Sequence, residues 1–215
     1  MQLGLWLVRI RLQGKDNTTV LDETISQWVN AALNGDQEAF AELLYTFQDA
    51  VYNLCYRLLG ERTEAEDATQ EAFLKAYYNL VRYDHERSFK TWVLSIASNH
   101  CIDRLRKRRM SYVSIDESIP ATLSLASNDP EPEQALLGHE RSQLIQAMLN
   151  DLQPDYRATV VLRYWYDYSY AEIAEILGDT ESAVKSRLYR ARQVLAEKMT
   201  TPSDEDLRNS LEERM

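Results

Sequence analysis

The chain has 215 residues, of which 45% are hydrophobic, and this length suits one large domain or two small ones with real cores. Six glycines, five prolines and a scarcity of alternating Val, Ile and Thr runs favour an all-α fold. The sequence contains no HExxH motif, phosphate-binding loop, metal-spaced cluster or nucleophile motif, so we expect neither an enzyme nor a bound metal or cofactor. Cys55 and Cys101 each fall within an expected amphipathic helix, which indicates buried free thiols in a reducing cytoplasm.

The formal net charge of −10 is unevenly distributed along the chain. Residues 82–109 carry eight basic and three acidic groups, whereas residues 110–137 carry five acidic groups and no basic one. Phosphate binding depends on the local field over a Debye length of about 8–10 Å, so a basic segment of an acidic protein can still bind DNA. The acidic remainder opposes nonspecific binding, which indicates that a partner helps the protein to bind DNA.

The first residues form an apolar run, MQLGLWLVRIRLQ, that is interrupted by Arg9 and Arg11. This run is too short to span a bilayer, which takes about 20 apolar residues. It also lacks the early basic region and the small-residue cleavage site of a signal peptide. We therefore expect residues 1–24 to form a disordered or loosely docked arm without stable membrane insertion, and a membrane anchor is the alternative.

Two helices are expected next in the chain. From Asp36 onwards apolar residues recur at helical spacing until Gly60, which ends the first helix because glycine readily adopts a left-handed backbone. Thr63 and Glu66 predict a capping box for the second helix, which extends to about Val81. Its inner positions are Ala65, Ala68, Ala72, Ala76 and Leu80. Its outer positions, which indicate either a solvated face or a binding surface, are Glu64, Asp67, Gln70, Glu71 and Lys75.

Residues 91–109, TWVLSIASNHCIDRLRKRR, predict a helix with two opposite stripes. The stripe that suits a core consists of Leu94, Ala97, Cys101 and Leu105. The opposite stripe consists of Trp92, Ile96, Asn99, Asp103 and Arg106. Aromatic side chains next to cations suit unpaired bases, because stacking holds the base and positive charge holds its backbone. The alternative is that Trp92 and Ile96 form a second core layer and that the arginines are an ordinary soluble helix end.

Residues 110–137 predict an extended acidic linker, because they contain three prolines, several Ser and Thr residues and no cation. A linker of this length argues against a tight contact between the two domains. The helical pattern resumes at Leu136, and Pro154 suits the first turn of the next helix. The aromatic run from Tyr164 to Tyr170 is typical of the core and rim of a small domain, with a ligand-binding box as the alternative. We expect the polar tail from Thr201 to be flexible.

Residues 168–195, YSYAEIAEILGDTESAVKSRLYRARQVL, predict two helices joined by a tight turn. Ser169 and Glu172 form an expected capping box, Gly178 ends the first helix, and Asp179 or Thr180 caps the second. One apolar stripe of the second helix consists of Val184, Leu188, Ala191 and Leu195. The opposite face carries Lys185, Ser186, Tyr189, Arg190 and Gln193. Such a helix can enter the major groove of DNA, and the alternative is a plain helical hairpin with solvated cations.

Taken together, these segments resemble the extracytoplasmic-function (ECF) sigma factors of bacterial RNA polymerase. The resemblance extends from about Leu33 to Met199 and rests on GDQEAFAELLYTF, AEDATQEAFLKAY, RSFKTWVLSIASNHCIDRLRKRR and the segment 152–192. It implies an all-α architecture of two small helical domains joined by a flexible linker. The implied division of the chain is region 2 at 25–109, an acidic linker at 110–135, region 4 at 136–200 and an acidic tail at 201–215.

The resemblance also implies roles for individual residues. The positions that match the family's contact with the largest polymerase subunit are Asp67, Gln70, Glu71 and Phe73. The positions that match its contact with bases of the minus-ten promoter element are Phe89, Trp92, Asn99, Asp103 and Arg106. The positions that match its contact with the minus-35 element are Lys185, Ser186, Tyr189 and Arg190. The sequence departs from the common family pattern at Thr180, Ser182 and Ala183, so the minus-35 sequence does not follow from the resemblance.

The partners implied by the resemblance are core RNA polymerase, promoter DNA and an anti-sigma factor, all in the cytoplasm, with no small-molecule substrate. The rival interpretation is a stand-alone helix-turn-helix regulator. Such regulators usually dimerise so that two recognition helices match half-sites about 34 Å apart. No long dimerisation seam is evident in the sequence beyond the helices described above.

Overall fold

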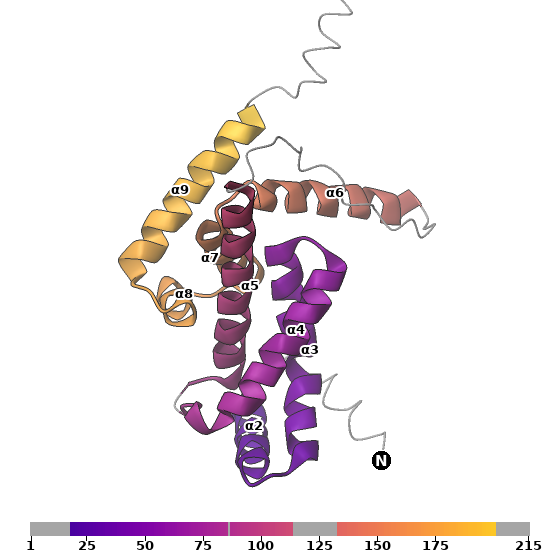
Figure 1. Ribbon diagram of the computed structural model, residues 1–215, viewed down its shortest axis with the longest axis vertical. Helices are drawn as coiled ribbons and strands as arrows, with labels where there is room; N and C mark the ends of the chain where they lie inside the picture. The colour runs from indigo at the N-terminus through magenta and orange to yellow at the C-terminus, as the bar shows by residue number, and fades with distance from the viewer. Residues whose placement is uncertain (1–17, 86, 114–132, 201–215) are drawn as a thin grey trace, which may run out of the picture.

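The computed structural model describes residues 18–85, 87–113 and 133–200, and all regular secondary structure in these ranges is helical (Figure 1). The N-terminal domain comprises α2 (Thr18–Leu33), α3 (Gln37–Leu59), α4 (Arg62–Asn79), the 3₁₀ helix η2 (Leu80–Arg82) and α5 (Phe89–Val113). The C-terminal domain comprises α6 (Glu133–Asn150), α7 (Pro154–Trp165), α8 (Tyr170–Leu177) and α9 (Glu181–Thr200). The prediction of an all-α protein with two helical domains is therefore confirmed.

Several predicted boundaries differ from the observed helix ends. Helix α2 begins at Thr18, so the last residues of the predicted arm are helical. Helix α5 continues to Val113, past the predicted end at 109, and α6 begins at Glu133. The expected linker, the first part of the arm and the tail fall at 114–132, 1–17 and 201–215, which lie outside the described residues.

Helix α3 forms the centre of the N-terminal domain. Its N-terminus is capped by Asp36, whose Oδ1 accepts hydrogen bonds from the backbone N–H groups of Glu38 at 3.0 Å and Ala39 at 3.2 Å. Its C-terminus ends, as predicted, at Gly60, whose φ of 82° lies in the left-handed region. The buried face of α3 packs against α2, α4 and α5.

The predicted capping box of α4 is wrong, because the helix begins earlier. The N-cap is Glu61, whose carboxylate accepts from the N–H groups of Thr63 at 2.9 Å and Glu64 at 2.7 Å. Gly60 ends α3 directly before Glu61, which places Glu61 at the cap, and Glu66 pairs instead with Arg62 at 3.2 Å. The inner positions are small and fully buried as predicted, which allows close helix packing, and they are Ala65, Ala68, Ala72 and Ala76.

The C-terminal domain is built around α7, which packs against both α8 and α9. Its buried side chains include Leu162 of α7, Ile173 of α8 and Leu188 of α9. The aromatic run occupies the core and rim of this domain as predicted, since Tyr164 is exposed and Tyr168 packs against the core.

The two domains are in contact, contrary to the expectation from the linker. Helices α6 and α7 pack against α3, and α7 and α8 pack against α5. In Figure 1 the long helix α5 therefore runs between α3 and α4 on one side and α7 and α8 on the other. The interface joins residues about a hundred positions apart, which no local sequence pattern specifies.

Three further features concern the part of the chain that the structure describes. None of its helices combines the length and apolar character needed to cross a bilayer. It brings no three His, Cys, Asp or Glu side chains together in a way that could hold a metal ion. Cys55 and Cys101 are buried free cysteines, as expected.

Candidate polymerase and nucleic-acid interfaces

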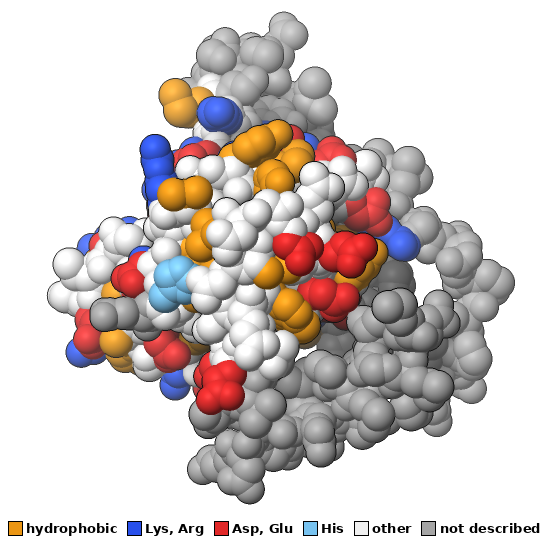
Figure 2. All heavy atoms as spheres, turned by 90° about the horizontal axis from the view of Figure 1, so that it is seen from below, with side chains coloured by type: hydrophobic (Ala, Val, Ile, Leu, Met, Phe, Trp, Pro, Cys, Tyr) orange, Lys and Arg blue, Asp and Glu red, His pale blue; other side chains and the backbone are white. Residues whose placement is uncertain are grey.

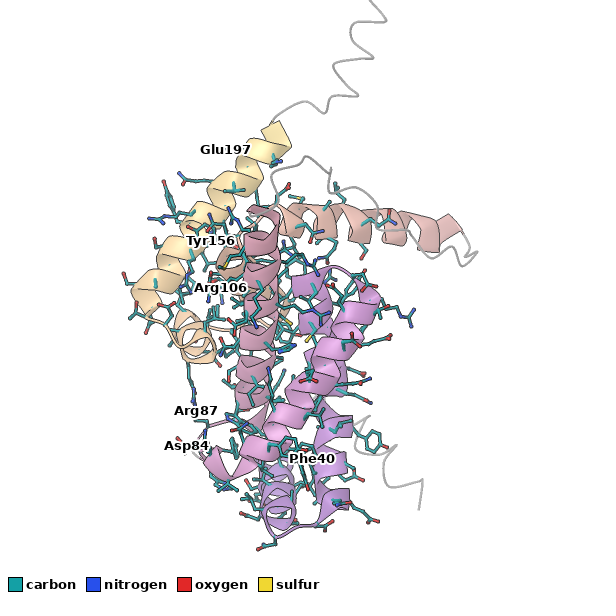
Figure 3. All side chains as sticks on the ribbon, in the orientation of Figure 1. Phe40, Asp84, Arg87, Arg106, Tyr156 and Glu197 are labelled. Carbon is teal, nitrogen blue, oxygen red and sulfur yellow. The ribbon has the colours of Figure 1, made fainter. Side chains whose placement is uncertain are left out.

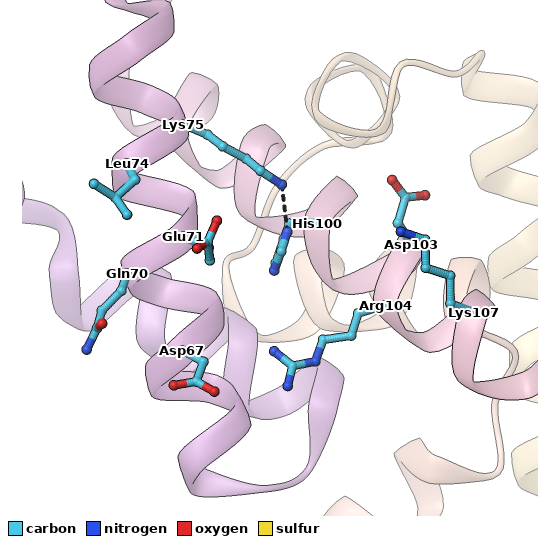
Figure 4. Close-up of a pocket in the computed structure, with 9 residues that line it drawn as sticks. All are labelled: Asp67, Gln70, Glu71, Leu74, Lys75, His100, Asp103, Arg104 and Lys107. Carbon is cyan, nitrogen blue, oxygen red and sulfur yellow. Dashed lines mark hydrogen bonds between the residues drawn. The ribbon is translucent and has the colours of Figure 1, made fainter. Parts of the chain in front are cut away.

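The outer face of α4 carries an acidic, polar patch. Asp67, Gln70 and Glu71 are exposed and line one side of a groove whose other wall is α5 (Figure 4). Phe73 is only 3% exposed and packs in the core, so it cannot contact a partner directly in this conformation. Its position on the opposite side of α4 follows from the helical period, because it lies between the buried alanines.

The acidic patch continues into an apolar one that sequence reasoning missed. Leu74 and Tyr78 follow Glu71 on the same face of α4, and they are 50% and 77% exposed. Exposed apolar groups next to polar ones are typical of a protein-binding surface. Their spacing after Asp67 and Glu71, at steps of three and four, is the signal that could have revealed them. Figure 2 shows the molecule from below the view of Figure 1, and on this face both acidic and hydrophobic side chains of the described residues are exposed.

A second groove lies between α4, η2 and the middle of α5. It is lined by Trp92, Asn99 and Asp103 from α5 and by Asn79 and Arg82 opposite them. The groove therefore combines an aromatic ring with amide, carboxylate and guanidinium groups, the chemistry needed to hold an unstacked base. Three of the predicted minus-ten residues are brought together here.

Phe89, a fourth predicted minus-ten residue, supports this groove from beneath. It is 2% exposed, and its ring lies 5.5 Å from the ring of Trp92 and 5.4 Å from that of Phe47. Tyr83 packs on the same cluster, with ring centroids 5.1 Å from Trp92. Phe89 thus positions Trp92 and cannot itself contact a base in this conformation.

The turn between α8 and α9 has the predicted local chemistry. The Oγ of Ser169 accepts from the N–H of Glu172 at 3.2 Å, and the Glu172 carboxylate accepts from the N–H of Ser169 at 2.8 Å. Hydrogen bonding of the Glu172 carboxylate to the side chain and then to the backbone of Ser169 lowers the pKa of Glu172 below its ordinary value. Gly178 has a φ of 65°, and Thr180 Oγ1 caps α9 by accepting from the N–H of Ala183 at 3.2 Å. The helix-turn-helix is therefore formed by local interactions.

Helix α9 presents one exposed polar face. The four predicted minus-35 residues lie together on it and are all exposed: Lys185, Ser186, Tyr189 and Arg190. The opposite stripe is buried against α7 and α8 at Val184, Leu188 and Ala191. A helix fixed on one side and offering cations and hydroxyl groups on the other has the geometry of a major-groove reader.

Comparison with known proteins identifies the family. The family description Sigma-70 region 2 matches residues 43–110, and Sigma-70, region 4 matches residues 142–195. The chain is 36% identical to the ECF RNA polymerase sigma factor SigW of Bacillus subtilis over 184 residues, which are 83% of this chain and 98% of SigW. The chain belongs to the ECF sigma factors.

Two further comparisons agree with this assignment. RNA polymerase sigma-H factor of Pseudomonas aeruginosa is 32% identical over 178 residues, which are 80% of this chain and 92% of that protein. The fold is similar to that of the sigma factor RpoE in its complex with the anti-sigma factor NepR from Bartonella quintana, with a TM-score of 0.58 and 23% identity. That likeness covers 75% of this chain and 97% of RpoE.

Three of the cations at the C-terminal end of α5 in this sigma factor are paired with acids. Glu64 of α4 lies 3.8 Å from Arg104 and also accepts from Arg108. Arg106, the fifth predicted minus-ten residue, donates to Asp155 of α7 at 2.7 Å. Arg106 also lies 3.8 Å from Asp103, which lines the groove of Trp92, but Arg106 does not line that groove itself.

The cations of α9 have different neighbours. Lys185 lies 5.9 Å from the centre of the Tyr170 ring, and Arg190 donates to the hydroxyl of Tyr156 at 3.3 Å. This hydrogen bond raises the pKa of Arg190 above its ordinary value. Tyr156 of α7 and Tyr170 of α8 thus contact the exposed polar face of α9, a role that the sequence analysis did not assign to them.

Proposed function

We propose a division of labour among three surfaces of this ECF sigma factor. The exposed face of α4 binds core RNA polymerase through Asp67, Gln70 and Glu71, and Leu74 and Tyr78 extend the contact. Phe73 supports this surface from the core. The observation that favours this role is that the acidic patch stands on a helix whose inner face is fixed by fully buried alanines.

The groove of α5 holds a base of the minus-ten element. Trp92 offers a stacking surface, and Asn99 and Asp103 offer hydrogen bonds to the edge of the base. Unstacking a base costs a few kcal/mol, so a preformed groove supported by Phe89 favours the open strand. Arg106 contacts the DNA backbone once it is released from Asp155.

The exposed face of α9 reads duplex DNA at the minus-35 element. Lys185 and Arg190 bind phosphates or base edges, while Ser186 and Tyr189 offer hydroxyl groups to the same groove. The single observation that carries this assignment is the exposure of all four residues on one face of a helix with a buried opposite stripe. The protein then supplies promoter recognition and no bond-breaking chemistry of its own.

A regulatory partner and a cellular location complete the proposal. An anti-sigma factor binds this protein in the cytoplasm, by analogy with the complex of RpoE and NepR. Masking the three surfaces named above would keep the sigma factor from polymerase and promoter until a signal releases it.

Reconstitution with core RNA polymerase tests the proposal. We expect selective transcription from a cognate promoter only when both proteins are present, and sequencing of the DNA retained by the complex would identify the promoter. The protein alone should be monomeric and bind promoter DNA weakly. A stable dimer that binds a palindromic operator tightly without polymerase would instead support a stand-alone regulator.

A further inference from the structure

The domain interface begins where the C-terminal domain covers the end of α3. Arg157 of α7 is 6% exposed, and its guanidinium donates to the carbonyl of Leu58 at 2.5 Å and to that of Asn150 at 2.8 Å. Gln146 of α6 donates to the carbonyl of Arg57 at 3.2 Å. The carbonyls of Arg57 and Leu58 belong to the last turn of α3, where the helix dipole favours a cation, and that of Asn150 lies at the end of α6. Burial lowers the pKa of Arg157 to about 10, so the group stays charged at neutral pH.

A second set of contacts joins the loop after α7 to α3 and α5. The hydroxyl of Tyr166 donates to the carbonyl of Ala50, and burial raises the pKa of this tyrosine. Lys90 of α5 lies 5.9 Å from the centre of the Tyr166 ring, and Arg57 lies 4.9 Å from that of Trp165. The interface is thus held by specific polar contacts in addition to apolar packing.

The third contact involves a residue assigned to DNA binding. Asp155 of α7 accepts from Arg106 of α5 at 2.7 Å, and Figure 3 labels Arg106 and Tyr156, the residue that follows Asp155. A carboxylate offers a guanidinium the same charge and the same acceptor geometry as a phosphate. Asp155 therefore binds the guanidinium of Arg106, which would otherwise be available to the promoter backbone.

The interface also has the polar character of a reversible contact. Three buried polar atoms at its centre have no hydrogen-bond partner: Arg57 Nη1, Gln146 Oε1 and Arg157 Nε. Such atoms cost free energy while the domains are docked and regain water when the domains separate. A permanent interface would instead be mainly apolar.

Promoter binding requires the domains to separate. The minus-ten and minus-35 elements are named for positions about 25 base pairs apart, which is roughly 85 Å at about 3.4 Å per base pair. Contact between Asp155 and Arg106 holds the two DNA-binding domains side by side. Residues 114–132 can span at most about 65 Å when fully extended, which together with the two domains is enough for the open arrangement.

We propose that the free protein rests in a closed state in which its own C-terminal domain inhibits the N-terminal one, with Asp155 standing in for DNA phosphate at Arg106. This inference rests on the proposed roles of α5 and α9 and adds a mode of regulation to them. Polymerase would open the protein by holding the domains apart, and no second protein is needed for the inhibition.

Two substitutions test the closed state in the full-length protein. Asp155→Asn removes the stand-in for phosphate, and Tyr166→Phe removes one interface hydrogen bond without changing any charge. Asp167→Asn is the matched control, because it removes the same charge from an exposed residue that pairs only within the C-terminal domain, with Arg163. Binding of the purified proteins to a single-stranded minus-ten oligonucleotide is measured by fluorescence anisotropy over a range of salt concentrations, and their size by small-angle X-ray scattering.

We expect Asp155→Asn to bind the oligonucleotide about 2–5-fold more tightly than wild type, because a partly exposed ion pair contributes a free energy of about this size. The slope of log affinity against log salt concentration should become steeper by the amount expected for about one more phosphate contact. Tyr166→Phe should raise the radius of gyration and also tighten binding, and Asp167→Asn should change neither quantity.

Two results would overturn the closed state: a wild-type radius of gyration as large as that of Tyr166→Phe, or equal effects of Asp155→Asn and Asp167→Asn. The proposed function has a separate readout, because it fails if the wild-type protein gives core polymerase no promoter selectivity. The scattering and oligonucleotide measurements use no polymerase, so the two failures are distinguishable.

Discussion

The basic ends of α5 and α9 differ in what their cations contact. On α5, Arg104 and Arg108 pair with Glu64, and Arg106 pairs with Asp155. Each of these carboxylates cancels positive charge at short range. The field that α5 presents to DNA is therefore weaker than its sequence, with five cations among residues 104–109, indicates.

Two cations on the exposed face of α9, Lys185 and Arg190, contact tyrosines, while Arg187 of the same helix pairs with Asp179. Lys185 lies over the ring of Tyr170, and Arg190 bonds the hydroxyl of Tyr156. A neutral phenol orients a cation without cancelling its charge, so α9 keeps its positive field. The two proposed DNA-binding surfaces are therefore in different states in the free protein: Lys185 and Arg190 of α9 are available to phosphate, whereas Arg104, Arg106 and Arg108 of α5 first have to lose their acidic partners.

The largest expected effect comes from reversing charge on α9. Lys185→Glu with Arg190→Glu should abolish promoter-selective transcription, a loss of at least about 30-fold if each reversal costs about 1–3 kcal/mol at the DNA contact. Binding to core polymerase, measured by native gel shift, should be unchanged because the acidic patch on α4 is untouched.

Lys198→Glu is the control for this double variant. It reverses a cation on the same helix that pairs with Asp151 at 3.5 Å and lies two turns beyond the DNA-facing residues. Selective transcription at half the wild-type level or more is expected. A loss of polymerase binding in Lys185→Glu with Arg190→Glu would show that α9 is not a dedicated DNA surface.

For α4 we expect the opposite result, a loss of polymerase binding with DNA binding retained. Asp67→Lys with Glu71→Lys should weaken binding to core polymerase by more than tenfold, because two exposed carboxylates at the proposed contact become cations. Duplex binding through α9 should persist. Asp22→Lys with Glu23→Lys makes the same change of charge on the exposed start of α2 and should bind polymerase normally in a pull-down. Equal losses of polymerase binding in the two double variants would contradict the assignment of α4 as the polymerase-binding helix.

Features determined by neighbouring residues could be predicted from the sequence. The capping box of Ser169 and Glu172 and the left-handed Gly178 depend on hydrogen bonds within a few positions, and both are observed. The cap of α4 was missed because Glu61, an uncommon cap residue, precedes the more typical Thr63.

Features determined by tertiary contacts could not be predicted in the same way. The sequence pattern marks Phe89 only as a family position, and its burial against Trp92 depends on α3 and Tyr83. The pairing of Arg106 with Asp155 joins residues 49 positions apart, and their spacing contains no periodic signal. The acids that distinguish α5 from α9 are therefore visible only in the folded protein.

A smaller effect is expected from removing the acid between the arginines of α5. Glu64→Gln should tighten binding of a single-stranded oligonucleotide about 2–5-fold, since it frees Arg104 and Arg108 from one partly exposed carboxylate. Glu66→Gln, which affects an exposed pair with Arg62, is the matched control in the same anisotropy assay. Unchanged binding in Glu64→Gln would mean that these ion pairs do not attenuate the field of α5.

The smallest expected effect is a pH dependence at His100, which lies between the two grooves. Its Nδ1 is 2.7 Å from the Nζ of Lys75, and because an ammonium only donates, Nδ1 accepts and the ring is neutral (Figure 4). Burial, and then the positive charge of Lys75, lower the pKa of His100 below 6.5, although Glu71 opposes the shift. The folded protein thus binds the proton less readily than the unfolded chain does.

This difference fixes the sign of the effect on stability. As pH falls below about 6.5, the unfolded chain takes up the proton first, so the contribution of neutral His100 is present above that pH and is lost as pH falls through the folded pKa. NMR titration should show a His100 pKa below 6.5. Urea unfolding of His100→Gln should lose part of the decline in stability between pH 7.5 and 5.5 that wild type shows. A His100 pKa above 6.5 would mean that Lys75 does not donate to the imidazole ring. The protonated ring would then add a positive charge between the two grooves that the observed geometry does not include.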